Sequence, residues 1–209
     1  MIIAVDGPTA SGKGTIAKAL GEHFGLPVLD TGLLYRAVGY QTQLNHGDAD
    51  NAADALAACD FPDSLLADPA LRYETTGGLA SRVSIHPQVR AALFRRQVDF
   101  ANQPGGAVLD GRDIGTVIAP HADAKLFVTA TPEERARRRH AEMRARGVDV
   151  GFEAVLADVH ARDARDTGRT DAPLRRAADA MLLDNTHMDR DAALAAAIAF
   201  VEERRKSRA

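Results

Sequence analysis

The sequence predicts an α/β fold of three layers with a five-stranded parallel sheet at its centre, and three observations lead to this prediction. Short apolar runs of strand length alternate with longer helical segments along the 209 residues. The first run, residues 2–5, passes directly into a glycine-rich turn and then into a helix. Four of the five runs end at an aspartate. In a parallel sheet such ends meet at the edge where ligands bind.

The apolar runs define the five strands. They are short and lack polar alternation, which is typical of strands that helices cover on both faces. We expect strands at residues 2–5, 28–29, 107–109, 125–129 and 180–183.

Helical segments lie between these runs. One of them begins at Thr131-Pro132-Glu133-Glu134, which combines a capping residue, a proline at the first helical position and acids in the first turn. In the helix that begins near Thr31, we expect the apolar residues Leu34, Val38 and Leu44 to point to one side. The expected helices span about 13–24, 31–44, 86–102, 131–146 and 151–166, and a last one begins at Asp189 or Asp191.

Residues 46–80 lack a sustained period and are rich in Asp, Ala, Gly and Pro. We expect an irregular insert there, with one helix near 51–58 and a short strand near 71–75. The length suits a single domain with an insert or a lid.

Composition excludes several function classes. The apolar fraction of 45%, the charged fraction of 26% and the net charge of −3 are ordinary for a soluble protein and do not predict a nucleic-acid or membrane surface. No apolar run approaches the roughly 20 residues of a membrane span, and no leader precedes the first strand. Cys59 is the single cysteine, so no intrachain disulfide can form. We therefore expect a cytoplasmic protein.

The turn after the first strand fits the pattern G-x-x-x-x-G-K and lies between a strand and a helix, the context that supports a phosphate-binding loop. Backbone N–H groups and the positive end of the helix would hold the phosphates of a nucleoside triphosphate. A lysine there would place a point charge on the outer phosphates during transfer. The loop residues are Gly7, Pro8, Thr9, Ala10, Ser11, Gly12, Lys13, Gly14 and Thr15.

One position departs from the usual loop pattern. Gly14 stands where Ser or Thr commonly follows the lysine as a Mg²⁺ ligand, and Thr15 comes one residue later. We expect no direct protein ligand beside Lys13, so that Mg²⁺ is held by water and by the phosphates of ATP.

Arginines are concentrated between residues 135 and 169, and they form two helical sets. Arginine stays charged and binds phosphate with two parallel hydrogen bonds. The first set is Arg135, Arg138 and Arg139. In the second set, helical spacing predicts one face with Arg162, Asp166 and Arg169 within roughly 60° of one another. The alternative for both sets is a solvated surface of ion pairs.

The segment Asp110-Gly111-Arg112-Asp113 follows the third strand. It places an arginine and two acids over a turn at the ligand-binding edge of the sheet. We expect a functional role there.

These motifs together resemble the nucleoside monophosphate kinases, and among them the bacterial cytidylate kinase family. The resemblance spans residues 2–184 and is carried by the phosphate loop and by six further segments: 29–36, 89–97, 110–116, 134–139, 162–169 and 178–184. It implies transfer of the γ-phosphate of ATP to CMP or dCMP, with Mg²⁺, by a monomer. It also implies a P-loop kinase fold with a core of about 1–45, 86–130 and 168–209, a nucleotide-binding insert of about 46–85 and a helical lid of about 131–167.

The resemblance also implies residue roles. Lys13, Arg135, Arg139 and Arg162 would be catalytic, and Arg138 would join the loop in binding ATP. The acceptor side would be formed by Thr31, Tyr35, Arg36, Ser81, Arg90, Arg112, Asp113, Arg162, Asp166 and Arg169. Within that set, Ser81, Arg90 and Asp113 would contact the base. Two departures are visible: the insert before Ser81 is shorter than in the family, and Thr31 replaces a more common serine.

Two alternatives from other classes stay open. A P-loop kinase for UMP, another monophosphate or a metabolite would share the loop, although a substrate without a base or a phosphate would not use Asp113, Arg90 or Arg162. A non-catalytic nucleotide-binding regulator would not need Lys13 or the arginines near 135–139.

Overall fold

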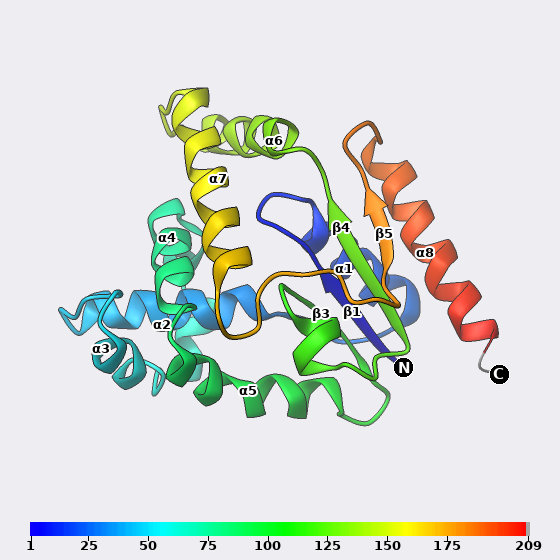
Figure 1. Ribbon diagram of the computed structural model, residues 1–209, viewed down its shortest axis with the longest axis horizontal. Helices are drawn as coiled ribbons and strands as arrows, with labels where there is room; N and C mark the ends of the chain where they lie inside the picture. The colour runs from blue at the N-terminus through cyan, green and yellow to red at the C-terminus, as the bar shows by residue number, and fades with distance from the viewer. Residues whose placement is uncertain (208–209) are drawn as a thin grey trace. The chain divides into compact units, whose positions relative to one another are not determined.

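The computed structural model describes residues 1–207. A five-stranded sheet has the order β2-β3-β1-β4-β5, and β1 pairs in parallel with both β3 and β4, as β4 does with β5 (Figure 1). The strands are β1 (Ile2–Asp6), β2 (Val28–Asp30), β3 (Ala107–Gly111), β4 (Ala124–Thr129) and β5 (Met181–Asp184). The predicted α/β class and the five strands are confirmed.

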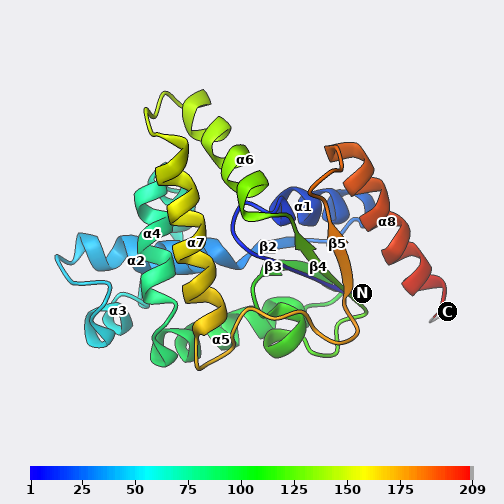
Figure 2. The ribbon, with the colours of Figure 1, turned by 45° about the horizontal axis from the view of Figure 1, so that its top comes forward.

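The chain forms two compact units. The first consists of Met1–Val28 and the chain from Ala101 onward. Its helical elements are α1 (Lys13–Phe24), η3 (Ile114–Ile118), α6 (Pro132–Ala145), α7 (Phe152–Gly168) and α8 (Arg190–Lys206). Helices α1 and α8 pack together beside the sheet, as both ribbon views show (Figures 1 and 2).

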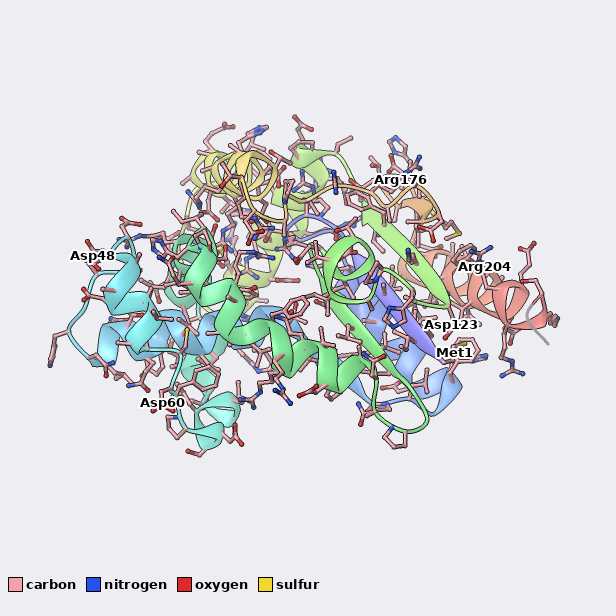
Figure 3. All side chains as sticks on the ribbon, turned by 60° about the horizontal axis from the view of Figure 1, so that its bottom comes forward. Met1, Asp48, Asp60, Asp123, Arg176 and Arg204 are labelled. Carbon is pink, nitrogen blue, oxygen red and sulfur yellow. The ribbon has the colours of Figure 1, made fainter. Side chains whose placement is uncertain are left out.

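The core of the first unit forms between the sheet and these two helices. Ile3, Val5, Leu126 and Val128 are buried from the strands. Leu20 of α1 and Val201 of α8 join the same cluster. At the N-terminal end of the strands, the carboxylate of Asp123 accepts a hydrogen bond of 2.7 Å from the backbone of Ile2 (Figure 3). A separate apolar cluster of Ala136, Val155 and Val159 holds α6 against α7.

The second unit, Leu29–Phe100, is mainly helical. It contains α2 (Thr31–Leu44), α3 (Ala52–Ala57), η1 (Asp63–Ala67), η2 (Pro69–Arg72), α4 (Glu74–Val83) and α5 (Pro87–Ala101), whose last residue already belongs to the first unit. A cluster that includes Leu34, Val38, Leu71 and Val83 forms its core. The predicted helix near 51–58 is confirmed.

The predicted strand at 71–75 is wrong. Asp68 accepts a hydrogen bond from the Ala70 backbone at 2.8 Å and starts η2, and α4 begins two residues after η2 ends. Thr76 then donates its hydroxyl to the Ala70 carbonyl at 2.7 Å. This local capping favours two short helical turns over a strand.

The prediction that Leu34, Val38 and Leu44 point to one side is wrong for Leu44, because this residue is 49% exposed. Leu34 and Val38 are buried. At about 100° per residue, Leu44 is turned about 120° away from Val38 around the helix, whereas Thr42 is turned only about 40° from it. Thr42 takes the buried place on that face and donates its hydroxyl to the Val38 carbonyl.

Candidate active site

The glycine-rich loop joins β1 to α1 at the carboxyl end of the sheet. Gly7 lies against β4, and a Cβ built on it would lie 2.1 Å from the Val128 carbonyl oxygen. A side chain there would force the loop off the strand. The loop therefore lies on the end of the sheet, where the N-terminus of α1 follows it directly.

The orientation of two loop peptides is fixed by side chains outside the loop. Arg135 Nη1 donates to the Thr9 carbonyl at 3.3 Å, and Asn185 Nδ2 donates to the Ser11 carbonyl at 2.9 Å. In a trans peptide the carbonyl and the next N–H point in opposite directions. The N–H groups of Ala10 and Gly12 therefore point away from these donors, as anion binding by the loop requires.

Lys13 is the first residue of α1, and Gly14 follows it. A Cβ on Gly14 would lie 2.9 Å from Asp110 Oδ2. This contact gives the physical reason for the departure at Gly14: the Asp110 carboxylate occupies the space that a serine or threonine would need. Thr15 is exposed at the helix start.

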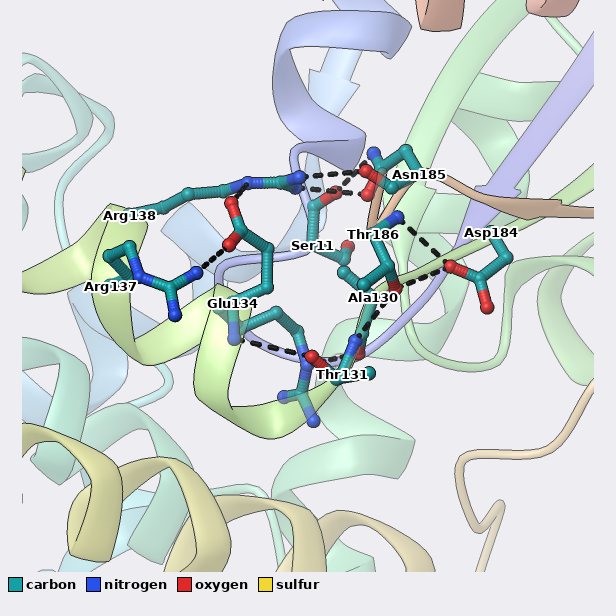
Figure 4. A network of polar contacts seen from close by, with 10 residues as sticks. Ser11, Ala130, Thr131, Glu134, Arg137, Arg138, Asp184, Asn185 and Thr186 are labelled. Carbon is teal, nitrogen blue, oxygen red and sulfur yellow. Dashed lines mark hydrogen bonds and ion pairs between the residues drawn. The ribbon is translucent and has the colours of Figure 1, made fainter. Parts of the chain in front are cut away.

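The three arginines of the first set have different surroundings on α6. Arg135 is buried and forms a two-point ion pair with Asp163 of α7, at 2.6 and 3.0 Å. Arg138 donates to Glu134 and, with its two terminal nitrogens, to Asn185 (Figure 4). Arg139 pairs with Glu142 at 3.1 Å, and burial lowers its pKa. A purely solvated surface is thus excluded for Arg135.

The second set is split by the end of α7. Arg162 and Asp166 are buried on one face of the helix, one turn apart. Arg169 lies beyond the helical residues, with an extended backbone at the C-cap, so the predicted face with all three members is wrong at this residue. The helix ends one residue earlier, at Gly168, where glycine disfavours helix continuation.

Charges converge on Asp166. Arg112 Nε donates to its carboxylate at 2.7 Å. Burial raises the pKa of Asp166, but the charges of Arg112, Arg169 and Lys13 lower it, and the net pKa lies below its ordinary value. Arg162 is paired with Asp158 at 2.8 Å, and burial lowers the pKa of its guanidinium. The first unit thus gathers the loop lysine and three arginines around one carboxylate.

Asp113 is buried at the end of the segment that follows β3. The backbone after it is held by Asp6, whose carboxylate accepts hydrogen bonds from Ile114 and Gly115 at 2.8 Å each. Burial raises the pKa of Asp6 to about 7, although these two hydrogen bonds oppose the shift. Asp6 therefore fixes the turn that carries Arg112 and Asp113.

The second unit holds the other predicted acceptor residues. Thr31 is buried at the start of α2. Arg90 Nη1 donates to the Tyr35 hydroxyl at 3.3 Å, and its guanidinium lies 6.0 Å from the centre of that ring. Arg36 donates to the carbonyls of Leu71 and Tyr73. Ser81 lies on α4 and is half-buried, and its carbonyl accepts a hydrogen bond from Ser84.

Sequence reasoning missed three residues that support these groups. Asp6 anchors the 112–116 turn, Asp163 holds Arg135, and Asn185 contacts both the loop and Arg138. Asp6 and Asp163 had a visible signal, since one ends a strand and the other follows Arg162 directly. For Asn185, the only signal in the sequence was its position directly after the fifth strand.

Among residues 1–207, no group of three or more His, Cys, Asp or Glu side chains is placed to hold a metal ion. No helix in that range is long and apolar enough to cross a membrane.

Comparison with known proteins identifies the family. The sequence profile described as Cytidylate kinase matches residues 3–203. The chain is 56% identical over 208 residues to the cytidylate kinase of Xanthobacter autotrophicus, with 100% of each chain covered. It is 54% identical to that of Caulobacter vibrioides, covering 98% of this chain and 96% of the relative. An uncharacterized protein from Eubacterium ventriosum has a similar fold, with a TM-score of 0.56, 16% identity and coverage of 97% and 98%.

Proposed function

This chain belongs to the cytidylate kinase family, and on that premise we propose that it is a monomeric kinase that transfers the γ-phosphate of ATP to CMP or dCMP. The products are ADP and CDP or dCDP. One observation of the site carries the proposal: Arg112 Nε donates to the buried carboxylate of Asp166 at 2.7 Å, and the charges of Arg169 and of Lys13 in the phosphate loop also lower the pKa of this carboxylate. The loop lysine that would hold the phosphates of ATP therefore interacts electrostatically with a carboxylate that could accept hydrogen bonds from sugar hydroxyls.

Catalysis by positioning and charge suffices for this reaction. The phosphate of CMP is already an anion, so no residue must act as a general base to create the nucleophile. Lys13 would hold the transferring phosphoryl group from the loop, and Arg135, Arg139 and Arg162 would neutralise the charge that spreads over its oxygens. Arg138 would join the loop residues Gly7–Thr15 in binding ATP.

The acceptor groups divide by the part of CMP that they would meet. Thr31, Arg36, Arg112 and Arg162 would bind the phosphate, with Tyr35 beside it. Asp166 would accept hydrogen bonds from the ribose hydroxyls, and Arg169 would contact the sugar or the phosphates. Support comes from the burial of Thr31, Arg162 and Asp166 in a chain whose other polar groups are mostly exposed.

Base selection follows from hydrogen-bond polarity. Cytosine has an amino donor at N4 and acceptors at N3 and O2, so Asp113 would accept from N4 while Arg90 and Ser81 donate. Uracil has the acceptor O4 in place of the amino group and a donor N–H at N3, so it would place an acceptor against Asp113. An unpaired buried polar group costs about 1–3 kcal/mol, so UMP should be the poorer substrate.

The chain's residues fit a magnesium ion that arrives with ATP. Residues 1–207 contain no cluster of three acidic, histidine or cysteine ligands, and Gly14 leaves no hydroxyl next to Lys13. Asp110, whose carboxylate lies beside Gly14, is the protein group that would face the hydrated ion. The ion would neutralise phosphate charge in the ATP complex.

Within this proposal the chain is one kinase domain with three roles. The core of about 1–45, 86–130 and 168–209 would hold the loop, the insert of about 46–85 would bind the acceptor nucleotide, and the lid of about 131–167 would cover the phosphates. The apolar contacts of α6 with α7 support treatment of the lid helices as one body.

A coupled assay of ADP release tests the function. We expect turnover with MgATP to be fastest with CMP and dCMP, and kcat/KM for UMP and AMP to be lower by about tenfold or more. Chelation of Mg²⁺ should abolish turnover. Equal rates with all four acceptors, or rapid turnover only with UMP or AMP, would overturn the assigned substrate.

A further inference from the structure

Asn185 follows β5 directly and is only 4% exposed. Its side chain has two polar ends, and each has a partner in the predicted ATP-binding machinery. Nδ2 donates to the Ser11 carbonyl of the loop at 2.9 Å, and Oδ1 accepts from Arg138 Nη1 at 2.9 Å (Figure 4). The Asn185 carbonyl accepts from Arg138 Nη2 at 2.8 Å. One residue of the sheet edge thus contacts both the phosphate loop and helix α6.

The chemistry of the partners fixes the orientation of the amide. A guanidinium only donates hydrogen bonds, and a backbone carbonyl only accepts them. The oxygen of the amide must therefore face Arg138, and the nitrogen must face Ser11. A carboxylate of the same size would present an acceptor to both, and a hydrocarbon side chain would satisfy neither.

The contact to Ser11 has a consequence for phosphate binding. The Ser11–Gly12 peptide is held with its carbonyl toward Asn185, which directs the Gly12 N–H to the other side of the loop. The backbone at Gly12 adopts the left-handed conformation, with φ 86°, immediately before Lys13. The hydroxyl of Ser11 is buried and has no hydrogen-bond partner among residues 1–207, so it does not contribute to holding this peptide.

The contact to Arg138 fixes a long side chain. Arg138 also donates to Glu134, so its guanidinium is held from two sides. An arginine that is already ordered loses less conformational entropy when a phosphate binds. Glu134 is shared with Arg137, which leaves Asn185 as the partner specific to Arg138 in this network.

We infer that Asn185 is a positioning residue for the donor nucleotide: it orients the Ser11–Gly12 peptide and holds Arg138 for the phosphates of ATP. The inference rests on the proposed function for the identity of the donor. It adds a residue outside the phosphate loop and outside the arginine sets. Its effect should fall on ATP and leave the acceptor nucleotide unaffected.

The test uses the variants Asn185→Asp and Asn185→Leu, with equilibrium binding of MgATP and steady-state kinetics as readouts. We expect the Kd and the KM for ATP to rise about tenfold in both variants, with the KM for CMP within about twofold of the wild-type value. Asp189→Ala is the matched control, because Asp189 lies four residues away and caps α8 through the Ala192 N–H without touching the loop. It should lower thermal stability and leave the KM for ATP unchanged.

A second comparison separates the two contacts of Asn185. In an Arg138→Met background, Asn185→Asp should still weaken MgATP binding by about threefold or more. The reason is that aspartate has no N–H to donate to the Ser11 carbonyl. No further loss in that background would overturn the part of the inference that concerns the loop. A fall in kcat with the Kd and KM for ATP unchanged would overturn the positioning role.

Binding of MgATP needs no acceptor, so the inference and the proposed function fail in different ways. If the wild-type protein binds MgATP but does not phosphorylate CMP, the assigned acceptor is wrong and the Asn185 test still stands. If CMP is phosphorylated and the Asn185 variants bind MgATP as tightly as the wild type, only the inference is wrong.

Discussion

The phosphate loop and the arginine-bearing helices α6 and α7 present positive charge by different means. The loop uses backbone N–H groups, whose direction is set by contacts of the Thr9 and Ser11 carbonyls on the opposite side. The helices use side chains, and Arg135, Arg139 and Arg162 each have an acidic partner already in place. Under the proposed function, the loop is therefore preorganised for phosphate, whereas the arginines would have to share or exchange a carboxylate when a phosphate binds.

From this difference we expect substitutions in the loop to reduce activity more than substitutions of the helical arginines. A loop group has no substitute, because its direction is built into the fold. An arginine that leaves a carboxylate for a phosphate gains only the difference between two charged contacts.

The largest effect should come from Lys13→Ala in the loop. Loss of one charged contact worth about 3 kcal/mol in the transition state lowers kcat by roughly 100-fold or more. Lys18→Ala, an exposed lysine on the same helix, is the control and should keep wild-type turnover. Single-turnover ADP formation measures both. Unchanged turnover in Lys13→Ala would contradict the expectation that substitutions in the loop reduce activity most.

A smaller effect should come from Arg162→Met on α7. Arg162 is buried and paired with Asp158, so its removal costs the difference between two charged contacts. We expect kcat/KM for CMP to fall about 10- to 100-fold, and the Kd of MgATP to stay within about threefold. Arg165→Met on the same helix should change kcat/KM by less than about threefold. Equal losses in the two variants would mean that only the net charge of α7 matters.

Asp163→Asn tests how much the acidic partner of a helical arginine contributes to stability and turnover. The variant keeps Arg135 but removes the charge from its two-point partner, so the guanidinium stays buried with a weaker acceptor. We expect the free energy of unfolding to fall by about 2–3 kcal/mol and kcat by about three- to tenfold. Urea unfolding and initial rates measure these changes. Asp149→Asn, at an exposed position between α6 and α7, should change neither quantity.

The sequence predicted the loop better than the environment of the arginines, for a physical reason. Loop geometry depends on neighbouring residues, and the strand, turn and helix around Gly7 and Lys13 are consecutive in the chain. The partner of Arg135 lies 28 residues away, and the partner of Ser11 lies 174 residues away. The hydrophobic periodicity of a sequence gives no information about contacts between residues so far apart in the chain. The predictions for Arg169 and for a strand at 71–75 were wrong because local capping decides where a helix begins and ends. Such boundaries are hard to predict to within a few residues.

The smallest expected effect concerns stability and the support that Asp6 gives the 112–116 turn. Its pKa of about 7 lies above the ordinary value of 3.8, so over this range the folded state binds a proton that the unfolded state releases. Stability from this group is therefore fully present below about pH 4 and is lost as pH rises through about 7. Asp6→Asn cannot titrate. The free energy of unfolding of the wild type, minus that of the variant, should fall between about pH 5 and about pH 8 in urea titrations. A difference that is constant with pH, or one that grows as pH rises, would show that the two backbone hydrogen bonds outweigh burial at this carboxylate.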